Sequence, residues 1–140
     1  MNHVIRGCDG QFDISIPVVV IGAGAAGLIA GLAAHDNGAQ VLIVERDANP
    51  SGSTALSSGL IPACNTRWQV ASKVIDNVEI FSQDIKRKNK GQADERLVDR
   101  SCLVSGEVLH WLADNHRQNF DLIEGFLYPG HSVHRMHCLT

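Results

Sequence analysis

Short apolar runs and one longer stretch rich in Ala and Leu alternate near the start of the chain. Pro17–Ile21 and Gln40–Glu45 are continuous, β-branched runs, a pattern typical of strands buried on both faces of a parallel sheet. Ala25–Asn37 lies between them and predicts a helix, and Gly38 supplies the left-handed residue that commonly ends one. Together these segments predict a right-handed βαβ unit over residues 17–45.

The second half of the chain carries helical patterns. Val78–Lys88 predicts a helix, and Gly91 breaks the pattern that follows it. Asp94 is a suitable N-cap for a longer helix that runs to about Asn115. The apolar positions that we expect on the buried face of this longer helix are Leu97, Val98, Val104, Val108, Leu109 and Leu112.

These elements predict the α/β class, a Rossmann-like domain with a parallel sheet, over residues 17–140. Residues 1–16 have no sustained period and are interpreted as an N-terminal extension. Residues 49–60 are dense in Ser, Gly and Pro and predict a loop, whereas residues 76–116 form a helical region. The pattern of residues 120–127 fits strand and coil equally.

Composition and charge exclude several classes. The chain has 140 residues, of which 44% are hydrophobic, so a single domain with a real core needs no disulfide or metal. The formal net charge is −3 and only 5% of the residues are aromatic, which argues against a nucleic-acid-binding protein. The basic run Lys86–Lys90 is interpreted as a solvated helix end.

A membrane span and a signal peptide both fit poorly. No charge lies between Ile14 and Ala34, a stretch long enough to cross a bilayer, but Pro17 and four glycines interrupt it. Asp9 and Asp13 precede the apolar run, and no small-residue cleavage site follows it. Because the four cysteines show no C-x-x-C spacing, we expect reduced thiols in a cytoplasmic protein.

Histidines and cysteines raise the question of a metal site. His131, His134 and His137 stand three residues apart with Cys138 adjacent, and both residue types bind zinc. Their spacing matches no common zinc pattern, so we expect no metal. Cys64 follows the predicted loop, where a reactive role would require a lowered thiol pKa.

One motif points to a specific chemistry. Gly22-Ala-Gly-Ala-Ala-Gly27 fits G-x-G-x-x-G, follows a predicted strand directly and opens a predicted helix. Gly22 permits the tight turn, Gly24 lets a pyrophosphate approach the backbone, and Gly27 lets the helix pack closely on the sheet. Glu45 ends the second strand, where it can accept hydrogen bonds from a ribose diol.

The motif leaves the ligand open. A glycine-rich turn that binds nothing is the alternative, and the surrounding strand, helix, strand and acid favour a dinucleotide instead. The carboxylate of Glu45 would repel a 2′-phosphate, which disfavours NADP. The motif does not separate NAD from FAD.

The wider sequence resembles a known flavoprotein family. The segments V-V-V-I-G-A-G-A-A-G-L, V-L-I-V-E-R and S-G-S-T-A-L-S-S-G are similar to the start of flavoproteins related to fumarate reductase and succinate dehydrogenase. That family includes ketosteroid dehydrogenases, aspartate oxidase and tricarballylate-type dehydrogenases. The later stretch G-H-S-V-H-R-M-H over Gly130–His137 resembles the family's G-x-S-V-x-R-x-H segment. The resemblance runs from about Pro17 to His137.

The resemblance implies FAD as cofactor and assigns residues to it. Ser53 and Thr54 would hydrogen-bond the diphosphate and ribityl region, and Arg46 would lie on the adenine side. In the fumarate reductase branch a second glycine follows the position of Gly59, whereas this chain has Leu60. The full set of implied FAD-binding residues is Gly22, Gly24, Ala25, Ala26 and Gly27 at the pyrophosphate, Glu45 at the ribose, Arg46, Ser53 and Thr54, and Ala55, Ser58 and Gly59 along the isoalloxazine.

The resemblance also implies a reaction, namely hydride transfer between the flavin and a carbon–carbon bond of a small carboxylate or ketone substrate. The family's catalytic groups come from later regions, so no catalytic residue is predicted in this chain. We therefore expect the N-terminal part of the FAD-binding domain of an oxidoreductase, which alone binds FAD weakly or not at all and turns nothing over. The alternatives are a catalytically inactive truncated product, a partner subunit or a small NAD-binding module.

Overall fold

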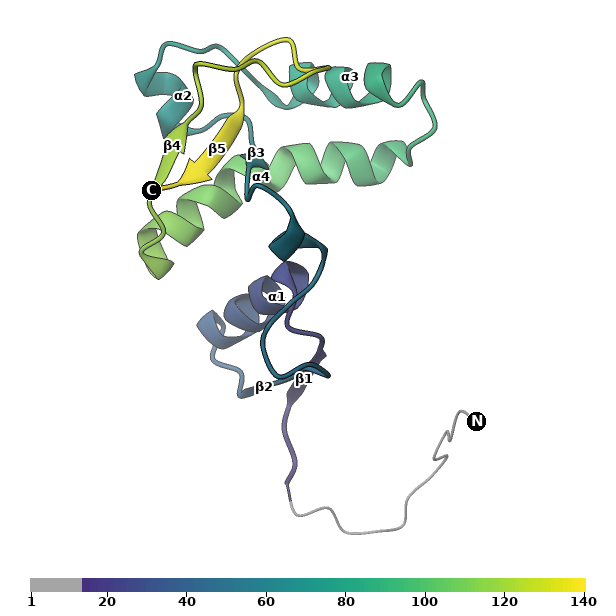
Figure 1. The fold of residues 1–140 in the computed structure, drawn as a ribbon, viewed down its shortest axis with the longest axis vertical. Coiled ribbons are helices and arrows are strands. Elements are labelled where there is room, and N and C mark those ends of the chain that lie inside the picture. Colours follow the sequence, from purple (N-terminus) through teal and green to yellow (C-terminus); the bar gives the residue numbers. More distant parts are fainter. Residues whose placement is uncertain (1–13) are drawn as a thin grey trace. The chain divides into compact units, whose positions relative to one another are not determined.

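The computed structural model describes residues 14–140, which divide into two compact units at Ser57 and Ser58. Figure 1 shows their elements, coloured along the chain. Almost all of the predicted N-terminal extension, residues 1–16, lies outside the described residues, and so does Cys8. Each unit has its own secondary structure and packing and is described separately below.

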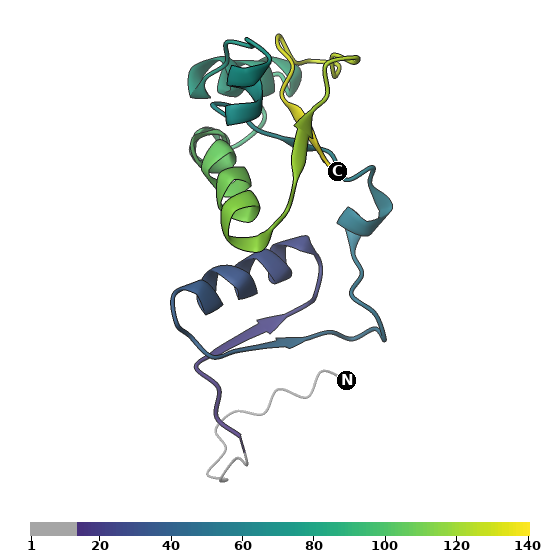
Figure 2. The same cartoon turned by 90° about the vertical axis from the view of Figure 1, so that its left-hand side faces the viewer.

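The first unit contains a parallel βαβ arrangement. Strand β1 (Val18–Ile21), helix α1 (Ala25–Asp36) and strand β2 (Val41–Val44) confirm the three elements predicted there. The two strands pair in parallel, from Val18 opposite Val41 to Ile21 opposite Val44. Figure 2 shows α1 over one face of the strand pair. Gly38 follows the helix with a φ of +82°, which confirms the predicted left-handed stop.

Helix α1 covers only one face of these strands. A Cβ on Gly31 would lie 2.8 Å from Cδ1 of Ile43, so the helix packs directly on that side chain. The opposite face is open in the described residues, where Val19 and Leu42 are exposed and Ile21 is 88% exposed. The prediction of strands buried on both faces is therefore wrong for the described residues, because a single helix covers a single face.

The second unit combines helices with a small antiparallel sheet. Its helices are α2 (Arg67–Ala71), α3 (Val78–Lys88) and α4 (Glu95–His116). Its strands are β3 (Ile61–Pro62), β4 (Phe120–Leu122) and β5 (Met136–Leu139), in the order β3-β5-β4. The sequence pattern did not predict α2, β3, β5 or this sheet. Strand β4 lies at the start of segment 120–127, whose pattern fitted strand and coil equally.

The ends of the two long helices follow from their capping residues. The side chain of Asn77 accepts a hydrogen bond from the backbone N–H of Ile80 at the start of α3. Asp94 does the same for α4, as predicted, by accepting from the N–H groups of Arg96 and Leu97. Helix α4 ends at His116, and the next residue, Arg117, adopts the left-handed conformation with a φ of +56°.

The hydrophobic core of the second unit lies between α3 and α4, which run side by side (Figure 1). Phe81 from α3 packs there with Val98 and Cys102 from α4. A Cβ on Gly106 would overlap the carbonyl oxygen of Cys64, so α4 lies directly against that backbone. The predicted burial of Leu97 is wrong: this side chain is 68% exposed, one position away from the buried Val98.

The second unit also buries charge. Arg135, fully buried, forms a two-point ion pair with Asp76, with N···O distances of 3.0 and 2.9 Å. Its third nitrogen donates to Asp84 at 2.7 Å, and its guanidinium lies 4.5 Å from the centre of the Phe81 ring. This cluster joins the residue before β5 to α3 and to the segment before α3. Within residues 14–140 no helix has the length and apolar character needed to cross a bilayer.

Candidate functional site

The candidate site lies where β1 and β2 end in the first unit. Gly22 leaves β1 with a φ of +102°, a conformation that L side chains rarely adopt, and its N–H donates to the carbonyl of Val44 at 2.7 Å. A Cβ on Gly27 would overlap the carbonyl oxygen of Gly22. Both glycines are therefore required by the fold of the turn itself.

Gly24 differs from Gly22 and Gly27, the other two glycines of the motif. Its φ of −73° and ψ of 175° are open to any residue, and a Cβ there would meet nothing closer than the carbonyl oxygen of Ser51 at 3.4 Å. The fold of this unit does not demand glycine at this position. The position suits a ligand that approaches the backbone closely, which is the role predicted for it.

Helix α1 starts immediately after Gly24, so Ala25, Ala26 and Gly27 form its first turn. The N–H groups of a first helical turn have no partners within the helix and carry the positive end of the helix dipole. Gly24 offers no side-chain cap, and the first turn contains no acidic residue. This end of α1 therefore suits the phosphate groups of a nucleotide.

A depression of about 200 Å³ adjoins this helix start. It brings two predicted residues of the loop, Thr54 and Ala55 from the 3₁₀ helix η1 (Ser53–Leu56), next to Gly24. The residues that line it are Ala23, Gly24, Ala25, Leu28, Pro50, Ser51, Gly52, Thr54 and Ala55. The loop thus folds back onto the glycine turn within the same unit.

Several lining residues were not predicted. Gly52 has a φ of +150°, and a Cβ there would lie 3.4 Å from the Cα of Gly24, so two backbones pass close to each other. Its place between Ser51 and Ser53 in the predicted loop was a signal for such an approach. Ser53 lies in η1 but does not line the depression.

Glu45 is fixed at the turn by two backbone donors. Its Oε2 accepts from the N–H of Ala23 at 2.7 Å, and its Oε1 accepts from the N–H of Asp47 at 3.0 Å. The hydrogen bond from Ala23, followed by that from Asp47, lowers the pKa of Glu45 below its usual value. The carboxylate is therefore charged at neutral pH, and further lone pairs on each oxygen can accept from ribose hydroxyls.

Other predicted residues lie outside this arrangement. Arg46 is solvent-exposed and pairs with its neighbour Asp47 at 3.2 Å. Ser58 and Gly59 belong to the second unit, where Gly59 has a φ of +71° just before β3. All twelve implied FAD contacts remain predictions. Among these residues, the first unit brings together those of the glycine turn, Glu45, Thr54 and Ala55.

The three histidines near the end of the chain have separate surroundings. The ring of His137 is buried beside Thr66, whereas His134 lies 3.3 Å from the carbonyl of Phe126. His131 is half-buried, and burial lowers its pKa. In the described part of the chain, no group of three or more His, Cys, Asp or Glu residues is placed to hold a metal ion.

Cys64 lacks the lowered thiol pKa that a reactive role would require. It is buried, and burial raises its pKa above the usual value, although a hydrogen bond with Ser105 opposes that shift. Cys102 is buried beside it, and burial raises its pKa to about 11. Both side chains serve the core between α3 and α4.

The parallel βαβ unit, the glycine turn and the acid at the end of the second strand are the features of the α/β folds that bind dinucleotides. Comparison with known proteins identifies which kind. The chain belongs to the family described as FAD binding domain, which matches residues 17–137. The family resemblance read from the sequence is thereby confirmed.

Individual relatives agree with this assignment. The chain is 37% identical over 100 residues to the NADH:fumarate oxidoreductase of Klebsiella pneumoniae (strain 342), covering 71% of this chain and 11% of that protein. It is similar to the open conformation of a flavocytochrome c3 fumarate reductase, with a TM-score of 0.79 and 34% identity over 87% of this chain and 21% of that one. It is also similar to the 3-ketosteroid-Δ4-(5α)-dehydrogenase of Rhodococcus jostii RHA1, with a TM-score of 0.68 and 34% identity over 76% and 22% of the two chains.

The chain therefore spans between about a tenth and a fifth of the length of these relatives. The predicted fold class is confirmed: it is a mixed α/β chain with a parallel β1–β2 pair that matches the start of a flavoprotein FAD domain.

Proposed function

We propose that this chain supplies the part of an FAD-dependent oxidoreductase that holds the adenosine and diphosphate half of FAD. The observation that carries this proposal is Gly24, a glycine that the fold of its unit does not require, at the start of α1 and beside Thr54. The N–H groups of Ala25, Ala26 and Gly27 would bind the diphosphate, and Glu45 would accept from the ribose diol.

FAD, when bound, supplies hydride transfer, which in this family occurs between the flavin and a carbon–carbon bond of a carboxylate or ketone substrate. The names of two relatives, a fumarate oxidoreductase and a ketosteroid dehydrogenase, support those two substrate classes. The residues of this chain would bind and orient the cofactor, and we assign none of them to catalysis. A cytoplasmic location is part of the same proposal.

Binding of FAD to the purified chain tests the proposal. In an amide NMR titration, FAD at about 1 mM, enough to populate even a weak site, is expected to move the resonances of Gly22–Gly27 and of Thr54. NAD carries the same adenosine and diphosphate groups and is expected to move Gly22–Gly27 as well, but not Ser58 and Gly59, because it lacks the isoalloxazine ring that these two residues are predicted to contact. No shift with FAD at this concentration would refute an FAD site formed by this chain alone, and a larger response to NAD would identify an NAD-binding module instead.

A glycine pair provides the matched control for this titration. Gly24→Ala adds one methyl group beside the phosphate position and is expected to abolish the FAD-induced shifts while the chain stays folded. Gly125→Ala adds the same group where no atom lies within 4 Å, and it is expected to bind FAD like the wild type. Equal binding by both variants would mean that Gly24 has no role in phosphate approach.

A further inference from the structure

One residue separates strand β3 from Ser58 and Gly59, two of the predicted isoalloxazine contacts, and the strand is therefore placed to fix their backbone. The strand is only two residues long and includes Pro62, so its own ladder holds it weakly. It pairs with β5 so that Ile61 faces His137. The backbone N–H of Ala63 extends this pairing by donating to the carbonyl oxygen of Arg135 at 2.9 Å. The side chain of His137 adds a contact, because its Nδ1 lies 3.3 Å from the carbonyl oxygen of Ile61.

The hydrogen positions on His137 follow from its partners. Nδ1 lies 3.0 Å from the carbonyl oxygen of Arg135 and 3.3 Å from that of Ile61. Carbonyl oxygens only accept, so Nδ1 carries the hydrogen and Nε2 is the acceptor of the neutral ring. The hydroxyl of Thr66, 2.9 Å from Nε2, then donates to it. Both side chains are fully buried.

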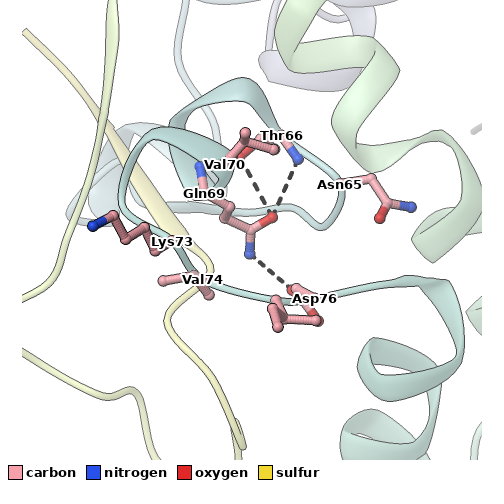
Figure 3. Close-up of a pocket in the computed structure, with 8 residues that line it drawn as sticks. Asn65, Thr66, Gln69, Val70, Lys73, Val74 and Asp76 are labelled. Carbon is pink, nitrogen blue, oxygen red and sulfur yellow. Dashed lines mark hydrogen bonds between the residues drawn. The ribbon is translucent and has the colours of Figure 1, made fainter.

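The groups around Thr66 offer its hydroxyl no second acceptor as close as Nε2 of His137. Its Oγ1 already accepts from the N–H of Gln69 at 3.1 Å, while Oε1 of Gln69 accepts from the N–H of Thr66 at 3.2 Å. The amide nitrogen of Gln69 donates to Asp76 at 2.8 Å, and Asp76 pairs with Arg135. Figure 3 shows Gln69 between Thr66 and Asp76, with dashed lines from its side-chain oxygen to Thr66 and from its side-chain nitrogen to Asp76.

We propose that Thr66 and His137 are positioning residues for the predicted flavin loop: they hold β3, and through it Ser58 and Gly59, in place only while His137 is neutral. The inference rests on the proposed function for the flavin itself. It extends that function by naming what fixes the far end of the loop. A protonated His137 would present a second donor at Nε2 to a hydroxyl that already donates there.

Protonation would then disturb the pair. The Thr66 hydroxyl would have to turn its hydrogen toward Oε1 of Gln69, which lies 3.5 Å away, a poor hydrogen bond. The other groups that face His137 are the Trp68 ring at 5.6 Å between centroids, His110 and Asp76. Burial lowers the pKa of His137 below its usual 6.5, two backbone carbonyls raise it, His110 lowers it and Asp76 raises it.

A pH titration of the labelled chain tests the link without any ligand. Between pH 8 and pH 5, the amide resonances of Ser58 and Gly59 are expected to move with the same midpoint as the ring of His137. His137→Gln keeps one donor and one acceptor but does not titrate, so these amides are expected to stay near their neutral positions throughout. His35→Gln, a change at a histidine of α1 in the first unit, is the control and is expected to leave the titration unchanged.

A second pair of variants addresses Thr66. Thr66→Val removes the hydroxyl at nearly constant volume and is expected to shift Ser58 and Gly59 at pH 7 as acid does in the wild type. Thr66→Ser restores the donor and is expected to restore the shifts. If Thr66→Val does not fold, the test uses the other two variants: the amides of Ser58 and Gly59 are expected to titrate in Thr66→Ser and not in His137→Gln.

FAD then separates this proposal from the proposed function. In the wild type, FAD affinity is expected to fall about tenfold between pH 7.5 and the acid side of the His137 titration, the loss of roughly one buried hydrogen bond, and to stay constant in His137→Gln. If FAD binds but Ser58 and Gly59 ignore the His137 titration, the positioning role is refuted and the proposed function stands. If they follow His137 but FAD shifts no resonance in any variant, the proposed function is refuted, and with it the link to a flavin.

Discussion

The backbone N–H of Ala23 donates a 2.7 Å hydrogen bond to Oε2 of Glu45 and so ties the end of β2 to the turn after β1. The same carboxylate accepts from Asp47, and both bonds lower its pKa. A negative charge is thereby held beside the glycine turn at neutral pH. In the proposed function, this placement would let one side chain accept from a ribose and repel a 2′-phosphate.

Replacing the Glu45 carboxylate by an amide tests this selectivity. Glu45→Gln keeps an acceptor for Ala23 but loses the charge, so it is expected to weaken ADP binding about tenfold and to reduce the preference for ADP over adenosine 2′,5′-bisphosphate. Calorimetric titration with the two nucleotides measures both effects. Glu107→Gln, at an exposed position of α4, is the control. An unchanged preference in Glu45→Gln would show that Glu45 does not face the ribose.

The glycines of the motif are expected to differ in their effect on stability. Gly27→Ala places a methyl group on the carbonyl of Gly22 and is expected to destabilise the first unit by about 1–3 kcal/mol. Gly24→Ala is expected to stay within about 0.5 kcal/mol of the wild type, since its Cβ meets no atom closer than 3.4 Å. Hydrogen exchange of the α1 amides measures the local stability. Equal destabilisation by both changes would contradict this assignment.

The buried ion-pair cluster is expected to be sensitive to loss of its cation. Arg135→Met leaves the carboxylates of Asp76 and Asp84 buried without their partner and is expected to cost about 3–5 kcal/mol. Urea unfolding followed by tryptophan fluorescence measures this loss. Arg96→Met, at a side chain that is 92% exposed, serves as the control and should change stability by less than about 0.5 kcal/mol.

Acid is expected to destabilise the second unit in two stages. Burial lowers the pKa values of His131 and His137, so the unfolded chain binds more protons below its own histidine pKa of about 6.5, and stability falls as the pH drops from there. Burial alone would raise the pKa of Asp84, but hydrogen bonds from Ser132, Arg135 and Arg87 outweigh it and lower that pKa to about 2. The stability that Asp84 contributes is complete above its unfolded pKa of about 4 and is lost as the pH falls toward 2.

Urea midpoints at pH 7, 5 and 3 measure both stages. Asp121→Asn, which changes an exposed carboxylate of β4, is expected to follow the wild-type pH profile. A midpoint that stays constant between pH 7 and 5 would contradict the histidine stage.

The cysteines are expected to differ in reactivity. Because burial raises the pKa values of Cys64 and Cys102, neither should react with a disulfide reagent at pH 8 in the folded chain. Cys138 is only half-buried and should react first among the described cysteines. Mass spectrometry of the labelled peptides separates these positions. Early labelling of Cys64 would mean that the core between α3 and α4 opens readily.

Local sequence signals predicted the elements that depend on neighbouring residues. The glycines at 22 and 38 adopt the positive φ expected of them, and Asp94 caps α4 where predicted. The strand, helix and strand of the first unit follow from continuous patterns in the same way. Each of these features is decided within a few residues, because turn and cap geometry depends on backbone conformation next to the residue concerned.

Contacts between segments that lie far apart in the sequence could not be predicted from such local signals. Strand β3 is two residues long, too short to show a period, and it exists through its pairing with β5 at Ile61 and His137. Leu97 fits the apolar stripe of α4 but is exposed, since the face that packs on α3 is centred on Val98 and Cys102. The apolar positions of a helix show which side is apolar, but they do not determine which residues at the border of that side contact the adjacent helix.

The sequence by itself determined the class of protein: a glycine turn and an acid, separated by a helix, are positions at which local backbone geometry permits few alternatives. Only the tertiary structure decided which of these groups meet. It brought the carboxylate of Glu45 within hydrogen-bond distance of the N–H of Ala23, placed Thr54 beside Gly24 and buried His137 against Thr66. Burial and charge depend on partners that lie far apart along the chain, and folding alone brings those partners together.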